Sequence, residues 1–356
     1  MAIPQELRFC IGADGTRLAY ARTGRGMPII KAANWLTHIE LDLLSPPWQP
    51  WIEEVSRIGQ LVRYDERGCG LSDHDVVDVS LDAHVADLEA VADAAGFERF
   101  ALIGVSQGGA LAVSYAARHP ERVSHLVLVG AFAKGVLKRD VPETVKETAR
   151  LTVQLIRLGW DQANPAFNQL FTTQMMPDAT AEVARRFNEM QRLSTSPEQA
   201  ARLIAASAEF DASAALPLVR CPTLVFHARA DARVPFEEGC RLASGIAGAR
   251  FVPLDSRNHV LLHDEPAWAV FASELRAFLS TGPQRTAPQA FSALTPKVRK
   301  LLDHLARRLD NAQIAAHLGL AQKTVRNTIT RVFEKLGVES RAQAIVRARE
   351  AGFGQR

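Results

Sequence analysis

The sequence predicts an α/β fold, with a doubly wound sheet and a helical cap, followed by a small all-α domain of four helices. Three observations lead to this prediction. Short apolar runs alternate with helical patterns up to residue 280, as expected where helices connect parallel strands. Within that part, residues 134–215 carry helical patterns only. A polar segment with two prolines and a glycine, residues 281–292, then reads as a linker to a second domain over residues 293–356.

Eight apolar runs are the candidate strands of the first domain, residues 1–280. The first two are joined through Asp14-Gly15, a dipeptide typical of hairpin turns. The later runs are continuously apolar, as buried parallel strands are. In chain order the runs are Leu7–Ile11, Arg17–Ala21, Pro28–Ala32, Gln60–Tyr64, Phe100–Val105, His125–Val129, Thr223–His227 and Arg250–Leu254.

Helical patterns lie between these runs. Ser80 is suited to cap the first helix and Gly96 to end it. We interpret residues 134–215 as a helical cap that is inserted after the sixth strand. The expected helices of the sheet domain lie near residues 81–95, 107–118, 237–246 and 266–279, and those of the second domain near 296–308, 311–318, 322–336 and 341–350.

The composition favours a globular, intracellular protein. Hydrophobic residues make up 47% of the 356 residues and charged residues 23%, which argues against a mainly disordered chain. No run approaches the ~20 apolar residues that span a bilayer, and the N-terminus lacks a signal-peptide pattern. The four cysteines show no CxxC pairing, so we expect no disulfide framework, no metal site and no cofactor. A reducing cytoplasm fits this cysteine usage, and no membrane partner is expected.

The two parts of the chain differ in charge. Residues 285–356 hold 14 Lys and Arg against 5 Asp and Glu, a net charge of +9. The remaining residues hold 28 basic and 34 acidic side chains, a net charge of −6. Such asymmetry indicates that the C-terminal part binds a polyanion.

A strand followed directly by Gly104-Val105-Ser106-Gln107-Gly108-Gly109 and a helix is typical of a nucleophile elbow. The strand must turn sharply into the helix, and the small residues make room for that turn. Ser106 would then be exposed at the turn, and the N–H of Gln107 would lie at a helix N-terminus, suited to stabilise an oxyanion.

Two further residues complete a candidate catalytic triad. Asp231 follows the strand that ends at His227, and His259 follows the last strand, so the order is Ser, acid, His. Both would lie in loops at the carboxyl edge of the sheet, where a base needs an orienting carboxylate. His263 is a competitor for the role of the base.

With these motifs, residues 7–280 resemble the α/β-hydrolase fold, and Tyr64–Asp73 resembles the loop after that family's fourth strand. The family usually has His-Gly after its third strand, where this chain has Ala33-Asn34. The resemblance implies that the Trp35 N–H is the second oxyanion donor and that its indole is a wall of the pocket beside Ser106. The apolar cap residues Phe171, Met175 and Met176 indicate a largely hydrophobic ligand.

Residues 293–353 resemble the helix-turn-helix of the LuxR family. The matching segments are Leu294-Thr295-Pro296, Asn311–Ala315, Leu318-Gly319-Leu320, Lys323–Arg326 and Glu334–Val338. The resemblance implies that the helix beginning near Gln322 lies in the major groove of DNA. Its candidate DNA-binding residues are Lys323, Thr324, Val325, Arg326, Asn327, Thr330 and Arg331.

The two resemblances together imply a transcriptional regulator whose hydrolase-like domain senses a small molecule and controls promoter binding. An active ester, lactone or thioester hydrolase whose turnover switches its own DNA-binding domain is the alternative. A binding-only module that brings partners to DNA is a third. The expected partners are promoter DNA, a small-molecule ligand and a second copy of the chain, with RNA polymerase as a further candidate. The apolar side of the last helix, with Ala344, Ile345, Ala348 and Ala351, is a candidate dimer contact.

Overall fold

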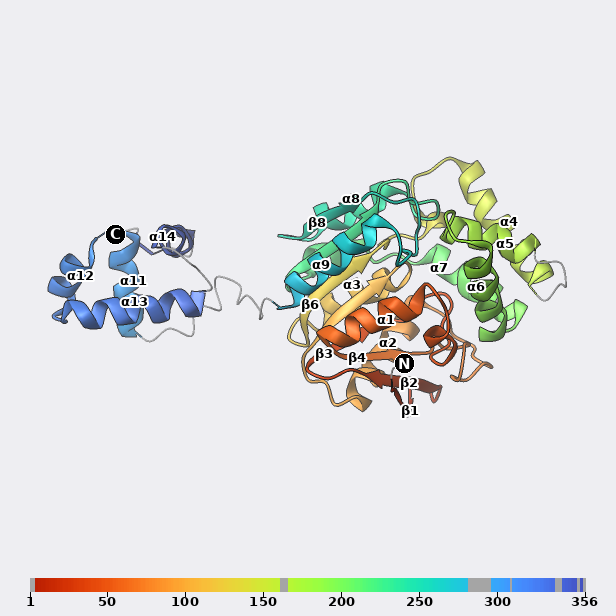
Figure 1. Cartoon of the computed structure of the whole chain (residues 1–356), viewed down its shortest axis with the longest axis horizontal. Coiled ribbons are helices and arrows are strands. Elements are labelled where there is room, and N and C mark those ends of the chain that lie inside the picture. Colours follow the sequence, from red (N-terminus) through yellow and green to blue (C-terminus); the bar gives the residue numbers. More distant parts are fainter. Residues whose placement is uncertain are drawn as a thin grey trace. The chain divides into compact units, whose positions relative to one another are not determined.

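The computed structural model describes residues 4–160, 166–280, 296–307, 309–336, 341–350 and 353–354. The chain divides into two compact units, Met1–Ser280 and Thr281–Arg356 (Figure 1). The predicted linker, residues 281–292, lies outside the described residues. None of the described helices is both long enough and apolar enough to cross a membrane.

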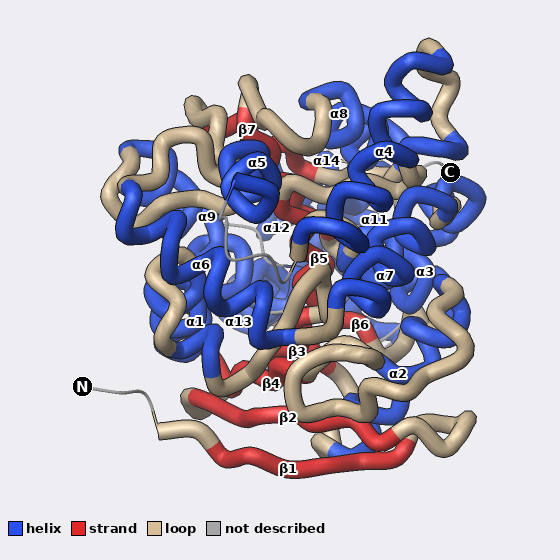
Figure 2. Tube along the Cα trace, turned by 90° about the vertical axis from the view of Figure 1, so that its right-hand side faces the viewer, coloured by secondary structure: helices blue, strands red, loops and turns tan. Residues whose placement is uncertain are grey.

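All eight predicted strands form and join one sheet in the order β1-β2-β4-β3-β5-β6-β7-β8. β1 and β2 are antiparallel and lie at one edge of the sheet (Figure 2), and the strands from β4 to β8 are parallel to one another. The predicted α/β fold class is therefore confirmed. The strands are β1 (Glu6–Ile11), β2 (Arg17–Thr23), β3 (Met27–Lys31), β4 (Gly59–Tyr64), β5 (Phe100–Val105), β6 (Val123–Val129), β7 (Thr223–Ala228) and β8 (Arg250–Leu254).

Helices cover both faces of the sheet because alternate residues of each central strand point to opposite sides. Ile103 of β5 packs on the side of α1 and α9, whereas the neighbouring Leu102 packs on the side of α2, α3 and α8. Both side chains are fully buried, and burying one such side chain contributes about 1.5–3 kcal/mol to stability. The helices are α1 (Trp48–Ile58), α2 (Leu81–Ala94), α3 (Gly108–Arg118), α8 (Phe236–Gly245) and α9 (Pro266–Ser280).

Helix α1 is absent from the elements predicted from sequence. Its buried residues Trp48, Trp51, Ile52 and Val55 have helical spacing, so the signal is present. The prolines around its start obscure that signal. Pro50 lies in the first turn of the helix, where the main-chain N–H has no intrahelical partner and proline is tolerated.

The predicted cap forms between β6 and β7. Its two connections to the sheet are paired with each other: the Gly135 N–H donates to the Phe210 carbonyl (2.7 Å), and the Ala212 N–H donates to the Ala133 carbonyl (2.8 Å). We call these two segments, 133–135 and 210–212, the neck of the cap. The cap consists of a short 3-10 turn η2 (Val136–Lys138) and the helices α4 (Glu143–Gly159), α5 (Ala166–Met175), α6 (Ala181–Ser194) and α7 (Pro197–Glu209); a second 3-10 turn, η3 (Ser213–Leu218), leads to β7.

The described residues of the second unit form four helices at the predicted positions. The side chain of Asp310 accepts from the Gln313 N–H (2.8 Å), and the side chain of Gln313 accepts from the Asp310 N–H (2.9 Å), which completes a capping box. Gly319 ends α12 in the left-handed conformation, with φ +62°. The helices are α11 (Pro296–Ala306), α12 (Asn311–Leu318), α13 (Gln322–Leu336) and α14 (Arg341–Glu350).

The proposed dimer contact on α14 is wrong for two of its residues. Ala344 and Ala348 are fully buried in the core of this unit, against residues such as Leu302 and Leu305 of α11. Small side chains at these positions let α14 pack closely against α11. Ala351 lies outside the described residues.

Replacing Asp310 with alanine removes the side-chain acceptor at the start of α12. We expect this change to cost about 1 kcal/mol of local stability, so that the amides of α12 exchange with solvent roughly five-fold faster. Hydrogen exchange of the full-length protein measures this rate. Asp310→Asn is the matched control, because asparagine caps about as well as aspartate. Equal exchange rates in the alanine variant and the parent would contradict the role of the cap.

Candidate functional site

The turn between β5 and α3 holds Ser106 in a strained backbone conformation. Its φ is +52°, and among the described residues Ser106 is the one non-glycine residue with positive φ. The Ser106 N–H donates to the Val129 carbonyl (3.0 Å), which ties the turn to the end of β6. A Cβ on Gly104 would lie 2.6 Å from the Gly108 carbonyl oxygen, and one on Gly108 would lie 2.8 Å from the Ala33 carbonyl oxygen. The turn therefore needs glycine at both positions.

His259 and Asp231 meet at the carboxyl edge of the sheet, as the sequence order predicts for a triad. Nδ1 of His259 lies 2.9 Å from Oδ2 of Asp231, and both side chains are buried. Oδ1 of Asp231 accepts from the N–H groups of Arg233 and Val234, each at 2.8 Å. Burial acts to raise the pKa of Asp231, but the charge and hydrogen bond of His259 outweigh it and hold that pKa below its ordinary value.

This geometry orients His259 as a base. A hydrogen bond from Nδ1 to the carboxylate favours the tautomer whose lone pair is on Nε2. Within the described residues, Nε2 is buried and has no hydrogen-bond partner, so it is free to receive a proton. Gly130 at the end of β6 leaves room for the ring, because a Cβ there would lie 3.1 Å from two atoms of the imidazole.

Two other histidines do not compete for this role. His263 is exposed and packs against Trp268, with ring centroids 5.4 Å apart. His227 is buried beside Asp231, but its Nε2 is bound to the Val234 carbonyl (3.0 Å), and burial lowers its pKa. His227 thus packs beside the acid, with its Nε2 already engaged.

The turn after β3 lies against the elbow and differs from the family pattern. Nζ of Lys31 donates to the side-chain oxygen of Asn34, which anchors the turn, and burial lowers the pKa of Lys31 to about 8. The Trp35 indole donates to the Ala200 carbonyl of the cap (3.1 Å). The Gln107 side chain donates to Oε1 of the buried Glu66 (2.6 Å).

The main-chain N–H groups of Trp35 and Gln107 are the predicted oxyanion donors. In the part of the chain that the structure describes, neither N–H takes part in a hydrogen bond. Gln107 is also the N-cap residue of α3, where free N–H groups and the helix dipole favour negative charge. Both groups are thus available to an oxyanion.

A cavity of about 310 Å³ lies over Ser106 and beneath the cap. Of the predicted ligand-binding residues, Ser106, Trp35 and Met175 line it. Phe171 and Met176 do not: Phe171 packs against Trp35, with ring centroids 4.4 Å apart, and Met176 is buried in the core. Apolar residues of the cap and of the segment that follows β6 complete much of the lining, namely Phe132, Val136, Val145, Val153 and Ile204.

Two arginines in the cavity wall were not predicted. Arg139 follows η2 and Arg233 lies two residues after the acid. No periodic pattern singles them out, because each lies in an irregular segment. Only the folding of the cap over the sheet brings them to the same cavity as Ser106.

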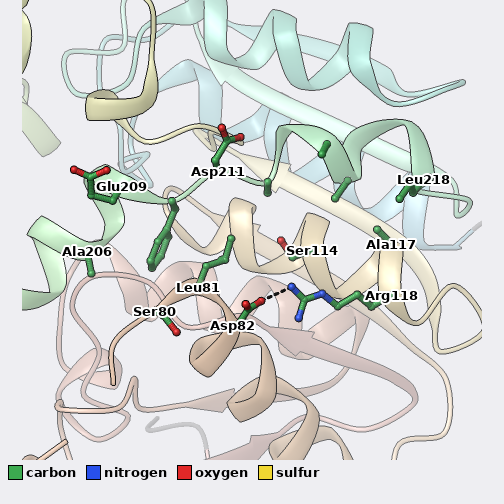
Figure 3. A pocket seen from close by; sticks show the side chains of 14 residues that line it. Ser80, Leu81, Asp82, Ser114, Ala117, Arg118, Ala206, Glu209, Asp211 and Leu218 are labelled. Carbon is green, nitrogen blue, oxygen red and sulfur yellow. Dashed lines mark hydrogen bonds and ion pairs between the residues drawn. The ribbon is translucent and has the colours of Figure 1, made fainter. Parts of the chain in front are cut away.

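A larger surface groove of about 680 Å³ lies away from the triad, between α2, α3 and the segment from the neck to η3 (Figure 3). Its four charged residues all have ion-pair partners: Asp82 and Arg118 pair with each other, Glu209 pairs with Lys138, and Asp211 pairs with Lys134. Its two serines have structural positions, since Ser80 caps α2 and Ser114 is buried. Its lining holds no histidine or cysteine, so the smaller cavity over Ser106 is the candidate site. Among the described residues, no group of three or more His, Cys, Asp or Glu is placed to hold a metal ion.

Helix α13 of the second unit presents a polar, basic face. Six of the seven predicted DNA-binding residues are exposed on it: Lys323, Thr324, Arg326, Asn327, Thr330 and Arg331. The prediction is wrong for Val325, which is fully buried in the core with Ile329 and Val332. These three residues recur at helical spacing and form the inner side of α13, so Val325 cannot reach a base.

The family model for the alpha/beta hydrolase fold matches residues 43–266. The chain belongs to this family. Residues 292–348 match the model for bacterial regulatory proteins of the luxR family, so the hydrolase domain is joined to a LuxR-type DNA-binding domain. Both resemblances inferred from sequence are confirmed. This combination supports a transcription regulator with a hydrolase-like domain.

Relatives of known name match the hydrolase domain. RutD of Rhizobium rhizogenes, provisionally named a carbamate hydrolase, is 28% identical over 222 residues, which cover 62% of this chain and 82% of that protein. The pimeloyl-[acyl-carrier protein] methyl ester esterase of Neisseria meningitidis is 28% identical over 219 residues, which cover 60% and 68%. An esterase structure from Exiguobacterium antarcticum superimposes with a TM-score of 0.66 at 21% identity and covers 77% of this chain and 99% of the other, which shows a shared fold.

A fluorophosphonate probe should label Ser106 of the hydrolase domain, because His259 can take the proton from its hydroxyl. His259→Ala should slow labelling by about 10³-fold or more, since the base is lost. Mass spectrometry of the labelled protein gives both the site and the rate. His263→Ala is the matched control and should label like the parent. A folded parent protein that stays unlabelled would show that Ser106 is not activated.

Proposed function

We propose that the hydrolase domain binds a small, largely hydrophobic signal molecule in the cavity over Ser106 and that binding controls promoter recognition by the LuxR-type domain. The observation that supports this proposal is a cap-covered cavity lined by Ser106, in a domain where His259 and Asp231 are hydrogen-bonded and in a chain that also carries a helix with a basic exposed face. The apolar lining of the cavity supports a ligand with a substantial hydrophobic part.

The same site would support slow cleavage of an ester, lactone or thioester. The Ser106 hydroxyl attacks the carbonyl carbon as His259 takes its proton, and the N–H groups of Trp35 and Gln107 stabilise the oxyanion. The leaving alcohol or thiol receives that proton, and water then hydrolyses the acyl-serine. The second candidate function is therefore an active hydrolase whose turnover switches its DNA-binding domain. The strained elbow and the oriented base favour it, whereas the unusual Ala33-Asn34 turn argues for slow chemistry.

For the LuxR-type domain, we propose that α13 enters the major groove. Its exposed residues divide by chemistry: Arg326 is suited to bind a guanine with two hydrogen bonds, whereas Lys323 is suited to contact a phosphate. Helix-turn-helix operators usually consist of two half-sites, so the working unit would be a homodimer. RNA polymerase would be a further partner at the promoter.

Arg326→Ala should weaken binding to the preferred operator by about 1–3 kcal/mol and relax the preference at one base position. Lys323→Ala should weaken binding to all sequences alike. It should also reduce the slope of log affinity against log salt concentration by about one, because one fewer phosphate is neutralised. Fluorescence anisotropy with operator and shuffled duplexes at several salt concentrations measures both effects. An Arg326→Ala protein with the affinity and selectivity of the parent would contradict the role of α13.

Occupying the cavity should alter DNA binding. A fluorophosphonate attached to Ser106 is a covalent occupant, and we expect it to change operator affinity by roughly 5- to 150-fold, the range typical of allosteric coupling. The measurement compares the labelled and unlabelled full-length protein on the same duplex. Ser106→Ala treated with the probe is the control and should not respond. Equal affinity of the labelled and unlabelled parent would contradict the sensor function.

A further inference from the structure

The cavity over Ser106 contains a half-buried positive charge that has no carboxylate partner among the described residues. Two guanidinium groups line it, those of Arg139 and Arg233, among walls that are otherwise largely apolar. A buried cation normally has a carboxylate partner or a hydrogen-bonded anion, because burying it alone is costly. The two arginines differ in whether the fold supplies such a partner.

The positive charge of Arg139 is compensated by other groups of the hydrolase domain. Its Nε donates to the Lys134 carbonyl (2.7 Å) and lies 3.5 Å from Oε1 of the buried Glu238. Its guanidinium also lies over the ring of Phe132, 5.2 Å from the centroid. Arg139 is therefore held by the protein and carries little unmatched charge.

Arg233 has no carboxylate within ion-pair distance among the described residues. Its side chain contacts are neutral: Nη1 donates to Oε1 of Gln174 (3.1 Å), and the guanidinium lies 5.0 Å from the centroid of the Phe171 ring. The acid nearest in sequence, Asp231, is already occupied, because its two oxygens accept from main-chain N–H groups and from His259. Burial lowers the pKa of Arg233 to about 10, which still leaves it charged at neutral pH.

Arg233 lies next to the acid of the candidate triad and lines the same cavity as Ser106. Its own N–H binds Oδ1 of Asp231, so the residue that orients His259 also fixes the backbone of the arginine. Arg233 and Ser106 both line the same cavity. An anion bound to the guanidinium would thus be held at a defined distance from the reactive hydroxyl.

We propose that Arg233 binds a carboxylate of the ligand, so that the natural ligand is an amphipathic carboxylic acid or the half-ester of a dicarboxylic acid. The carboxylate is planar and matches the two-pronged guanidinium, and the apolar walls accommodate the hydrocarbon part. This inference rests on the proposed function, because it names the ligand class of the same cavity.

Calorimetric titration of the full-length protein with hexanoate and hexanamide tests the proposal. The two probes have similar shape and differ in charge. We expect the affinity for hexanoate to exceed that for hexanamide by about ten-fold or more, because charge-assisted hydrogen bonds are stronger than neutral ones. Arg233→Gln should abolish that difference, whereas Arg233→Lys should retain part of it. Arg257→Gln is the matched control, because Arg257 is an exposed arginine that pairs with Asp178 (2.6 Å).

Fluorophosphonate labelling of Ser106 in the Arg233→Gln protein shows whether the site still folds. Equal affinity of the two probes for the parent, or an unchanged preference in a folded Arg233→Gln protein, would overturn the assignment. Tighter binding of hexyl phosphate than of hexanoate would replace the carboxylate with a phosphate and also overturn it. Hexanoate that binds through Arg233 but leaves DNA affinity unchanged would contradict the sensor function alone.

Discussion

The hydrolase domain depends on one close main-chain contact. The turn from β5 into α3 passes between the end of β6 and the loop after β3 and touches both. Ser106 adopts a left-handed backbone there, and the adjacent glycines allow main-chain atoms to come into contact. This contact holds the loop that carries Trp35 against the elbow. Ser106 lies at the carboxyl edge of the parallel strands, where loops from separate strands converge and where His259 and Asp231 meet. The floor of the ligand cavity is therefore built from rigid elements, while the cap supplies its walls.

Much of the fold was predictable because its signals are local. Apolar runs predicted every strand, and Ser80 predicted the start of α2, which its side chain caps. The errors have physical causes. Prolines obscured α1, although they fall where a helix tolerates them. Val325 lies in sequence among the predicted DNA-binding residues, yet helical geometry turns it into the core.

The candidate site was predictable in part for a related reason. Ser106, Asp231 and His259 follow strands, so the strand pattern alone brings them to the same edge of the sheet. Arg139, Arg233 and Phe171 belong to irregular or inserted segments, and their surroundings depend on how the cap folds. Phe171 therefore packs against Trp35 instead of lining the cavity. The lack of a carboxylate partner for Arg233 among the described residues is evident only once its neighbours are known.

The paired neck of the cap has an evolutionary consequence. The chain leaves the sheet and returns to it through segments that are hydrogen-bonded to each other at Gly135 and Ala212. An insertion with adjoining ends can be shortened, lengthened or exchanged without moving the strands on either side. Variation within the cap can thus change the lining of the cavity over Ser106, while the sheet, the elbow and the second unit keep their sequences. New cavity shapes would then arise by recombination at the neck, without a redesign of the sheet.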